Sequence, residues 1–155
     1  MSGGVRMREY KFRAWDSWWD KMHYFDFAKN IEATPDNELK GLWILHKEGS
    51  VYAIQDKIKI MQFTGLYDKN GKEIYEGDIL KRTSTIKQWK RELFEEIIGK
   101  VTIKIGMTYL VGKRKHGYLD EELKISNCKE LLLSPDLFEV IGDIHSNPEL
   151  LESGE

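Results

Sequence analysis

Turn-forming residues recur at short intervals along residues 62–80, QFTGLYDKNGKEIYEGDIL, and divide this segment into strand, turn, turn and strand. Residues 57–64 alternate in character and are rich in β-branched and aromatic side chains, which predicts a strand that ends at Gly65. The pair Asn70-Gly71 is the one best suited to the two positive φ angles of a type I′ hairpin turn. The segment therefore favours short, antiparallel strands.

A second turn is expected at Gly77, where a Glu-Gly-Asp corner opens into Ile-Leu, as at the entry to an SH3-like small barrel. In this interpretation Asp68 and Asp78 serve the backbone, because Asp, Asn and Gly have sufficient reason to stand in turns. The alternative is a small enzyme whose carboxylate site is assembled in space from Asp68, Glu76 and Asp78. We favour the structural role, and we predict no catalytic residue, no cofactor and no metal site.

Three separated blocks of the chain resemble the YopX family in order and approximate spacing. Residues 62–80 resemble its signature segment, MREYKFRAWD at 7–16 resembles its opening, and FEVIGDIHSNPELL at 138–151 resembles its closing motif. The resemblance implies a protein encoded by a phage or prophage of Gram-positive bacteria, and it brings no biochemical activity with it. Residues 83–96 and 113–133 depart from the family pattern, so any specialised function is expected there.

The predicted fold class is α+β and strand-dominated, with bent antiparallel sheets and an SH3-like small barrel in the C-terminal part. A chain of 155 residues suits one compact domain. We expect a disordered extension over residues 1–6 and a single YopX-like domain over 7–155. Within it, N-terminal hairpins (7–60) would pack on the barrel-like part (61–155).

Period-two alternation predicts further strands, with hairpins near both ends of the N-terminal part. The expected strands cover residues 9–15, 21–27, 42–46, 50–55, 100–106, 107–111 and 137–144. The spacing of Ile86, Trp89, Leu93 and Ile97 predicts a short helix over 86–98. Helical turns are expected at 120–124 and 127–133, and Asn147 with Pro148 predicts a brief terminal helix.

Composition limits the function classes. The formal net charge of −2 argues against a globally steered polyanion binder. The single cysteine, Cys128, excludes an intramolecular disulfide, and no apolar run is long enough to span a membrane, so we expect a cytoplasmic protein, in the host cytoplasm if it is phage-encoded. The glycine patterns of phosphate-binding and nucleophile motifs are absent, and no histidine has metal-site spacing.

The strongest nucleic-acid candidate is the basic stripe over residues 81–91, KRTSTIKQWKR. It carries five cations and one aromatic ring, a composition that suits phosphate contact and base stacking. Its residues are Lys81, Arg82, Lys87, Trp89, Lys90 and Arg91. We favour the simpler interpretation, a solvated charged face with Trp89 turned into the core.

Trp18 and Trp19 form the other candidate contact site. They are unusual for the family and would lie at the tip of the first hairpin, where exposed tryptophans are strong anchors for protein contact. Packing back over the sheet is the alternative. Our leading hypothesis is a non-catalytic phage or prophage accessory protein that acts by contact with a host or phage protein, or as a homo-oligomer. Nucleic-acid binding is the second hypothesis and the carboxylate enzyme the third.

Overall fold

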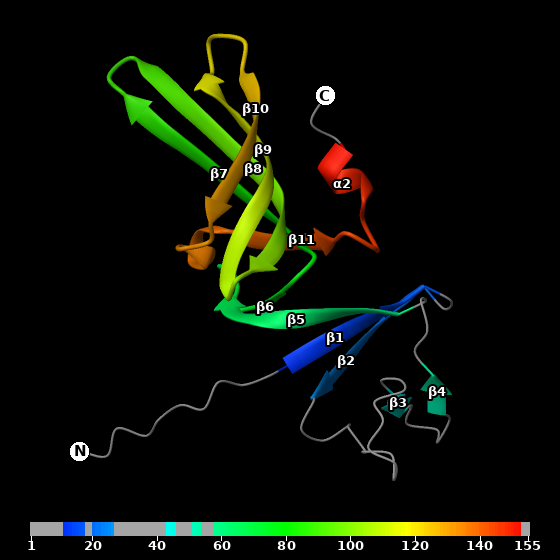
Figure 1. Ribbon diagram of the computed structural model, residues 1–155. Coiled ribbons are helices and arrows are strands. Elements are labelled where there is room, and N and C mark those ends of the chain that lie inside the picture. The colour runs from blue at the N-terminus through cyan, green and yellow to red at the C-terminus, as the bar shows by residue number, and fades with distance from the viewer. Residues whose placement is uncertain (1–10, 18–19, 27–42, 46–50, 54–57, 153–155) are drawn as a thin grey trace, which may run out of the picture. The chain divides into compact units, whose positions relative to one another are not determined.

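Figure 1 shows the computed structural model, which describes residues 11–17, 20–26, 43–45, 51–53 and 58–152. The chain divides into two compact units, residues 1–63 and 64–155. The expectation of disorder over residues 1–6 concerns a segment outside the described residues. Among the described helices, none has the length and apolar character needed to cross a membrane.

In the first unit, β1 (Lys11–Asp16) lies between two antiparallel neighbours, β2 (Lys21–Asp26) and the start of β5 (Ile58–Tyr67). The hairpin predicted from residues 9–15 and 21–27 is thereby confirmed. A separate two-stranded sheet joins β3 to β4, in agreement with the second predicted hairpin. Its strands are Trp43–Leu45 and Val51–Ala53.

Arg13 departs from the predicted alternation of β1. The pattern places Arg13 on the solvent side, but the residue is only 3% exposed and its Nη2 lies 3.7 Å from the sulfur of Met61. Its neighbour Ala14 is also fully buried. Both faces of the strand are therefore covered at this point, which a period-two pattern cannot indicate.

The second unit is dominated by a five-stranded antiparallel sheet in the order β10-β9-β8-β7-β11. β6 (Glu73–Tyr75) instead pairs with β5. The five strands are β7 (Asp78–Gln88), β8 (Arg91–Lys104), β9 (Met107–Tyr118), β10 (Lys124–Leu131) and β11 (Glu139–Asp143). A 3-10 helix, Pro135–Leu137, precedes β11, and the short helix α2 (Glu149–Glu152) follows it, where a terminal helix was expected.

One face of this sheet carries the core. Val101 on β8 pairs with Leu110 on β9, and Ile97 lies on the same face as Val101 because side chains of a strand alternate. The buried cluster comprises Ile74, Leu80, Ile97, Val101, Leu110, Leu132, Phe138 and Val140. Full burial stabilises the fold by about 1.5–3 kcal/mol for each such side chain, and a slip of one residue would expose the whole set. Burial therefore fixes the register.

Gly99 and Gly112 face each other across β8 and β9 where the backbones approach too closely for side chains. A Cβ added at Gly112 would lie 2.0 Å from the Ile98 carbonyl oxygen, and one at Gly99 would lie 3.0 Å from Cγ of Leu110. Glycine in a strand commonly marks such a close approach or a sharp bend. The facing glycines thus permit the curl of this sheet.

Gly65 does not end its strand. β5 continues to Tyr67 with Gly65 at φ +80°, because a glycine can take a left-handed angle as an irregularity within a strand. Asn70-Gly71 is also not a type I′ turn, since only Gly71 has a positive φ. The N–H of Gly71 donates to the carbonyl of Asp68, and the N–H of Asp68 donates to that of Lys72. This is a three-residue hairpin loop, which consists of a type I turn followed by a glycine in the left-handed conformation.

The helix predicted over residues 86–98 is wrong. These residues form the end of β7, a two-residue turn at Trp89-Lys90 and the first half of β8. The helical turns predicted at 120–124 and 127–133 are also wrong, because β9 and β10 form a further hairpin there. Figure 1 shows these hairpins as the long arm of the second unit.

The strand-dominated prediction is confirmed: the antiparallel sheets are curled as in a half-barrel, and the described residues contain one short α-helix. The α+β label and the SH3-like assignment stay predictions.

Candidate functional site

The turn between β7 and β8 presents Trp89 to solvent. Gln88 and Arg91 close the turn as a cross-strand pair, so Trp89 and Lys90 form a two-residue loop. The Trp89 residue is 96% exposed and has φ +52°. The favoured prediction, Trp89 in the core, is therefore wrong. A bulky side chain at positive φ is an outlier that persists only where its surroundings hold it.

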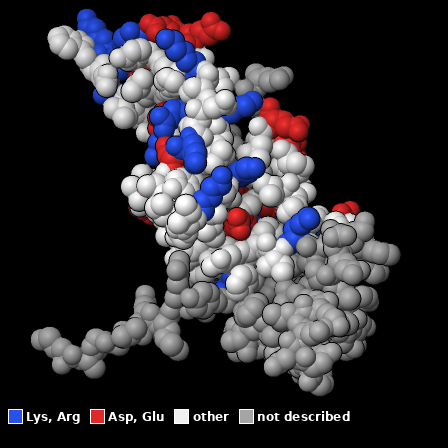
Figure 2. All heavy atoms as spheres, viewed as in Figure 1, with Lys and Arg blue, Asp and Glu red and all other residues white. Residues whose placement is uncertain are grey.

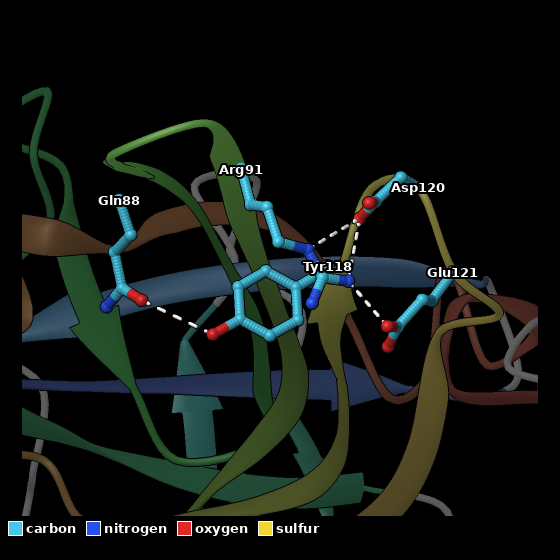
Figure 3. A network of polar contacts seen from close by, with 5 residues as sticks. All are labelled: Gln88, Arg91, Tyr118, Asp120 and Glu121. Carbon is cyan, nitrogen blue, oxygen red and sulfur yellow. Dashed lines mark hydrogen bonds and ion pairs between the residues drawn. The ribbon is translucent and has the colours of Figure 1, made fainter.

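A network of polar contacts ties this turn to the neighbouring β9–β10 turn (Figure 3). The Nη2 of Arg91 donates to Oδ1 of Asp120 at 2.9 Å and also to Glu121, while its Nε donates to Asp120 at 3.2 Å. The Arg91 guanidinium lies 3.7 Å from the centroid of the Tyr118 ring, and the Tyr118 hydroxyl donates to Gln88 at 3.4 Å. We call these five residues the tip brace. It joins both strands of the β7–β8 turn to the adjacent hairpin.

Electrostatics in the tip brace is consistent with its geometry. The hydrogen bond from Arg91 lowers the pKa of Asp120, and the bonds to Asp120 and Glu121 raise the pKa of Arg91. Each shift favours the charged forms that make the contacts. These groups lie at the surface, so the brace positions the turn more than it stabilises the whole fold.

The basic stripe is not one surface. Because side chains alternate along a strand, Lys81 and Lys87 lie on one face of the sheet, and Arg82 lies on the other. Lys81 pairs with Glu96 at 2.8 Å, Lys87 pairs with Glu92 at 3.6 Å, and Arg82 pairs with Glu95. Arg91 belongs to the tip brace, and Lys90 is exposed beside Trp89. Most of the positive charge in the stripe is thus compensated within the protein.

The carboxylate of Asp68 is buried and accepts three backbone hydrogen bonds. Its Oδ1 accepts from the N–H groups of Asn70 and Lys72 at 2.8 and 2.9 Å, and its Oδ2 accepts from that of Val140 at 3.0 Å. Burial alone raises the pKa of Asp68, but the three backbone donors outweigh it and hold that pKa below its ordinary value. Asp68 therefore joins the signature turn to β11.

The other two acids of the enzyme hypothesis also contact the backbone. Asp78 is 1% exposed and its Oδ2 accepts from the N–H of Tyr75 at 2.7 Å, across the corner where Gly77 has φ +82°. Glu76 accepts from the N–H of Ile103 at 3.5 Å. The arrangement gives each acid a partner in the protein.

Three further kinds of site bear on function: a metal centre, the Cys128 thiol, and Trp18 with Trp19. No group there of three or more His, Cys, Asp or Glu residues could hold a metal ion. Burial and the nearby Glu130 raise the pKa of Cys128, which disfavours the reactive thiolate. Trp18 and Trp19 lie outside the described residues.

Sequence reasoning missed the brace. The sequence places Arg91 in the basic stripe, and its partners Asp120 and Glu121 lie in the segment 113–133, where the sequence predicts helical turns. The only local signal was the group of acidic residues at 120–122.

Comparison with known proteins gives the family. The model of the family described as YopX protein matches residues 11–152, so this chain belongs to the YopX family. No curated protein matches the chain. Among solved structures, the crystal structure of protein EF1440 from Enterococcus faecalis is similar, with 28% sequence identity and a TM-score of 0.45; the match covers 92% of this chain and 97% of that one.

Proposed function

We propose that this YopX protein is a non-catalytic accessory protein of a phage or prophage that binds another protein through the tip of the β7–β8 hairpin. One observation carries the proposal: Trp89 is 96% exposed on a turn that is held in place by the tip brace. Tryptophan is among the residues that most often dominate binding energy at protein interfaces.

Preorganisation supports this role. Binding costs free energy for each mobile segment that must be ordered, and a turn already fixed to its neighbour avoids part of that cost. The contacts of Arg91 with Asp120 and Tyr118 fix the direction in which the β7–β8 turn leaves the sheet (Figure 3). The side chain of Trp89 takes no part in those contacts and is therefore available to contact a partner protein.

An apolar row next to the turn extends the candidate contact surface. Ile86 pairs with Leu93, which pairs in turn with Tyr118, and Ile86 is 53% exposed. Leu119, at the start of the neighbouring turn, is 51% exposed. A central aromatic anchor with partly exposed apolar neighbours is the usual arrangement of an interface hot spot.

The test compares two single substitutions at matched positions. Trp89→Gly removes the anchor and places glycine where φ is positive, so the turn should keep its shape. Ile105→Gly is the control, because Ile105 is 95% exposed at the β8–β9 turn and also has a positive φ of 51°. Partners captured from host cells by the wild-type protein are purified and titrated calorimetrically against each variant.

The expected result is a loss of affinity of about 30-fold or more for Trp89→Gly, as for an interface hot spot, and no change for Ile105→Gly. Equal affinity of both variants for every purified partner would contradict the proposal. The same pair of variants is titrated with single-stranded DNA, since an exposed ring can also stack a base. Binding of DNA that depends on Trp89, without a protein partner, would favour the nucleic-acid alternative.

The proposal also includes three predictions made from the sequence: an SH3-like arrangement, a cytoplasmic location and self-association. The Glu-Gly-Asp corner at residues 76–78 supports an SH3-like arrangement of the half-barrel. The protein would work in the host cytoplasm, where Cys128 would be a reduced thiol. If the protein self-associates through the tip, its sedimentation coefficient should depend on concentration, and Trp89→Gly should abolish that dependence.

A further inference from the structure

A groove lies on the face of the five-stranded sheet opposite its core, away from the residues of the tip brace. It has a volume of about 560 Å³ and is formed by β8, β9, β10 and the helix α2. Ile98, Val111 and Leu151 give it an apolar lining, and three lysines, Lys100, Lys113 and Lys129, also line it. One lysine comes from each of the three strands.

The strand register places these lysines around the apolar floor. Val111 on β9 pairs with Lys100 on β8 on one side and with Lys129 on β10 on the other. Two residues further along, Lys113 pairs with Ile98 and Asn127. Neighbouring strands are about 4.8 Å apart, so the ammonium groups on both sides can reach one ligand that covers Val111.

The lysines of the groove differ from those of β7 in their charge compensation. Lys81 and Lys87 each have a carboxylate partner on β8. No ion pair joins Lys100, Lys113 or Lys129 to any acidic residue of the described part, and Lys129 instead lies 5.0 Å from the ring centroid of Tyr109. Like charges gathered on one face without compensation are unfavourable, so this site favours a bound anion.

Two features favour a short acidic peptide over a nucleic acid. No aromatic ring lines the groove, and base stacking on such rings is the usual source of affinity for single strands. Glu149 and Glu152 of α2 are exposed on both sides of Leu151, where they would repel a long polyanion. Figure 2 shows Lys and Arg side chains along the sheet, with Asp and Glu side chains among them and at its outer end.

We propose that this groove binds an acidic peptide segment of a partner protein, in which an apolar side chain is flanked by carboxylates. The apolar side chain covers Val111 and Ile98, and the carboxylates pair with the three lysines. This surface is separate from the Trp89 turn in its residues, so it specifies the chemistry of a partner without depending on the tip contact.

The experiment uses the full chain and three labelled probes, followed by fluorescence anisotropy at low and high salt. The first probe is a peptide with one leucine between two pairs of glutamates, the second has serine in place of that leucine, and the third is oligothymidylate of equal charge. The groove variant combines Lys100→Gln, Lys113→Gln and Lys129→Gln. The control variant combines Lys104→Gln, Lys115→Gln and Lys124→Gln, which removes the same charge from exposed positions of the same three strands.

We expect the leucine peptide to bind with an affinity that falls at high salt, and the groove variant to bind it about tenfold more weakly, while the control variant stays within about twofold. The serine peptide should bind more weakly than the leucine peptide to the wild-type protein. Equal effects of the two triple variants, tighter binding of oligothymidylate than of the leucine peptide, or no peptide binding at millimolar concentration would each overturn the proposal. Because both triples leave Trp89 intact, such a failure is distinct from a failure of the tip contact.

Discussion

The signature turns at residues 68–78 and the tip brace, which joins residues 88–91 to Tyr118, Asp120 and Glu121, use acidic residues for different purposes. Asp68 and Asp78 are buried, and their carboxylates accept hydrogen bonds from backbone N–H groups. Asp120 at the tip is exposed, and its carboxylate holds the guanidinium of Arg91. The first region uses its acids to fix the path of the chain, and the second uses them to fix the position of one turn.

The motif that identifies the family and the candidate contact site therefore lie in different parts of the chain. The signature block is accounted for by the needs of the backbone: a glycine with positive φ within β5, two more at the turns, and buried acids that accept hydrogen bonds from backbone N–H groups. The hairpin tip lies outside the signature block. A motif that identifies a family can thus be its scaffold, and the site of contact can lie where the motif is absent.

The largest expected effect on stability belongs to the signature turn. Asp68→Ala removes the acceptor of three backbone donors, one of them the buried N–H of Val140, and should lower the free energy of unfolding by about 2–3 kcal/mol. Asp68→Asn keeps one oxygen acceptor and should cost less. Urea denaturation of both variants measures this, and a loss below about 0.5 kcal/mol for Asp68→Ala would show that the turn does not depend on this acid.

The tip should behave in the opposite way. Trp89→Gly should leave the free energy of unfolding unchanged or raise it by up to about 1 kcal/mol, because glycine relieves the cost of a left-handed angle. Loss of a packed core tryptophan would instead cost about 3–5 kcal/mol. Destabilisation of more than about 2 kcal/mol in the same urea assay would mean that the ring is packed and is not a free anchor.

Arg91→Met tests the tip brace with a side chain of similar reach. It removes the contacts to Asp120 and Glu121 and should increase amide hydrogen exchange at residues 86–92 and 118–121 several-fold. Exchange at the core strand residues around Ile97 and Val101 should not change. Uniform acceleration over the whole second unit would show that the brace is part of the global fold.

Acid pH should give the smallest effect and a definite order. The folded-state pKa values of Asp68 and Asp120 are both lowered, so each contributes stability that is present above the ordinary aspartate pKa of about 4 and is lost as pH falls through the folded value. Below about pH 4 the amide protection factors of the wild-type tip should fall, and those of Arg91→Met should not change further. The loss of global stability in the same range should be reduced in Asp68→Asn.

The sequence was sufficient to predict the strands where glycine marks the turns between them. Gly71 and Gly77 take positive φ angles, and the strands on both sides of them follow as predicted. The turn at Trp89-Lys90 contains no Gly, Asn or Asp, so it gave no such signal. Ile86 and Leu93 are instead directly opposite across that turn. Their spacing of seven residues is also the spacing of two turns along one face of a helix, which led to the wrong prediction.

The candidate site was less accessible to sequence reasoning for a physical reason. Arg91 meets Asp120 only because two hairpins lie side by side, and the three groove lysines come together through the register of β8, β9 and β10. Spacing along one strand indicates which face a side chain lies on, but it does not indicate which neighbour compensates its charge. The sequence therefore showed the basic stripe but not the carboxylates that pair with its cations, and it did not show the groove.

The central claim is that Trp89 is held out from the fold for a protein partner. It is tested most directly by 19F NMR of protein labelled with 5-fluorotryptophan, with the Trp89 signal identified by its absence in Trp89→Gly. The account predicts a resonance with the full solvent isotope shift in the free protein, which moves and loses that shift when the purified partner is added. A Trp89 signal already shielded from solvent in the free protein, or unchanged at saturating partner, would contradict it.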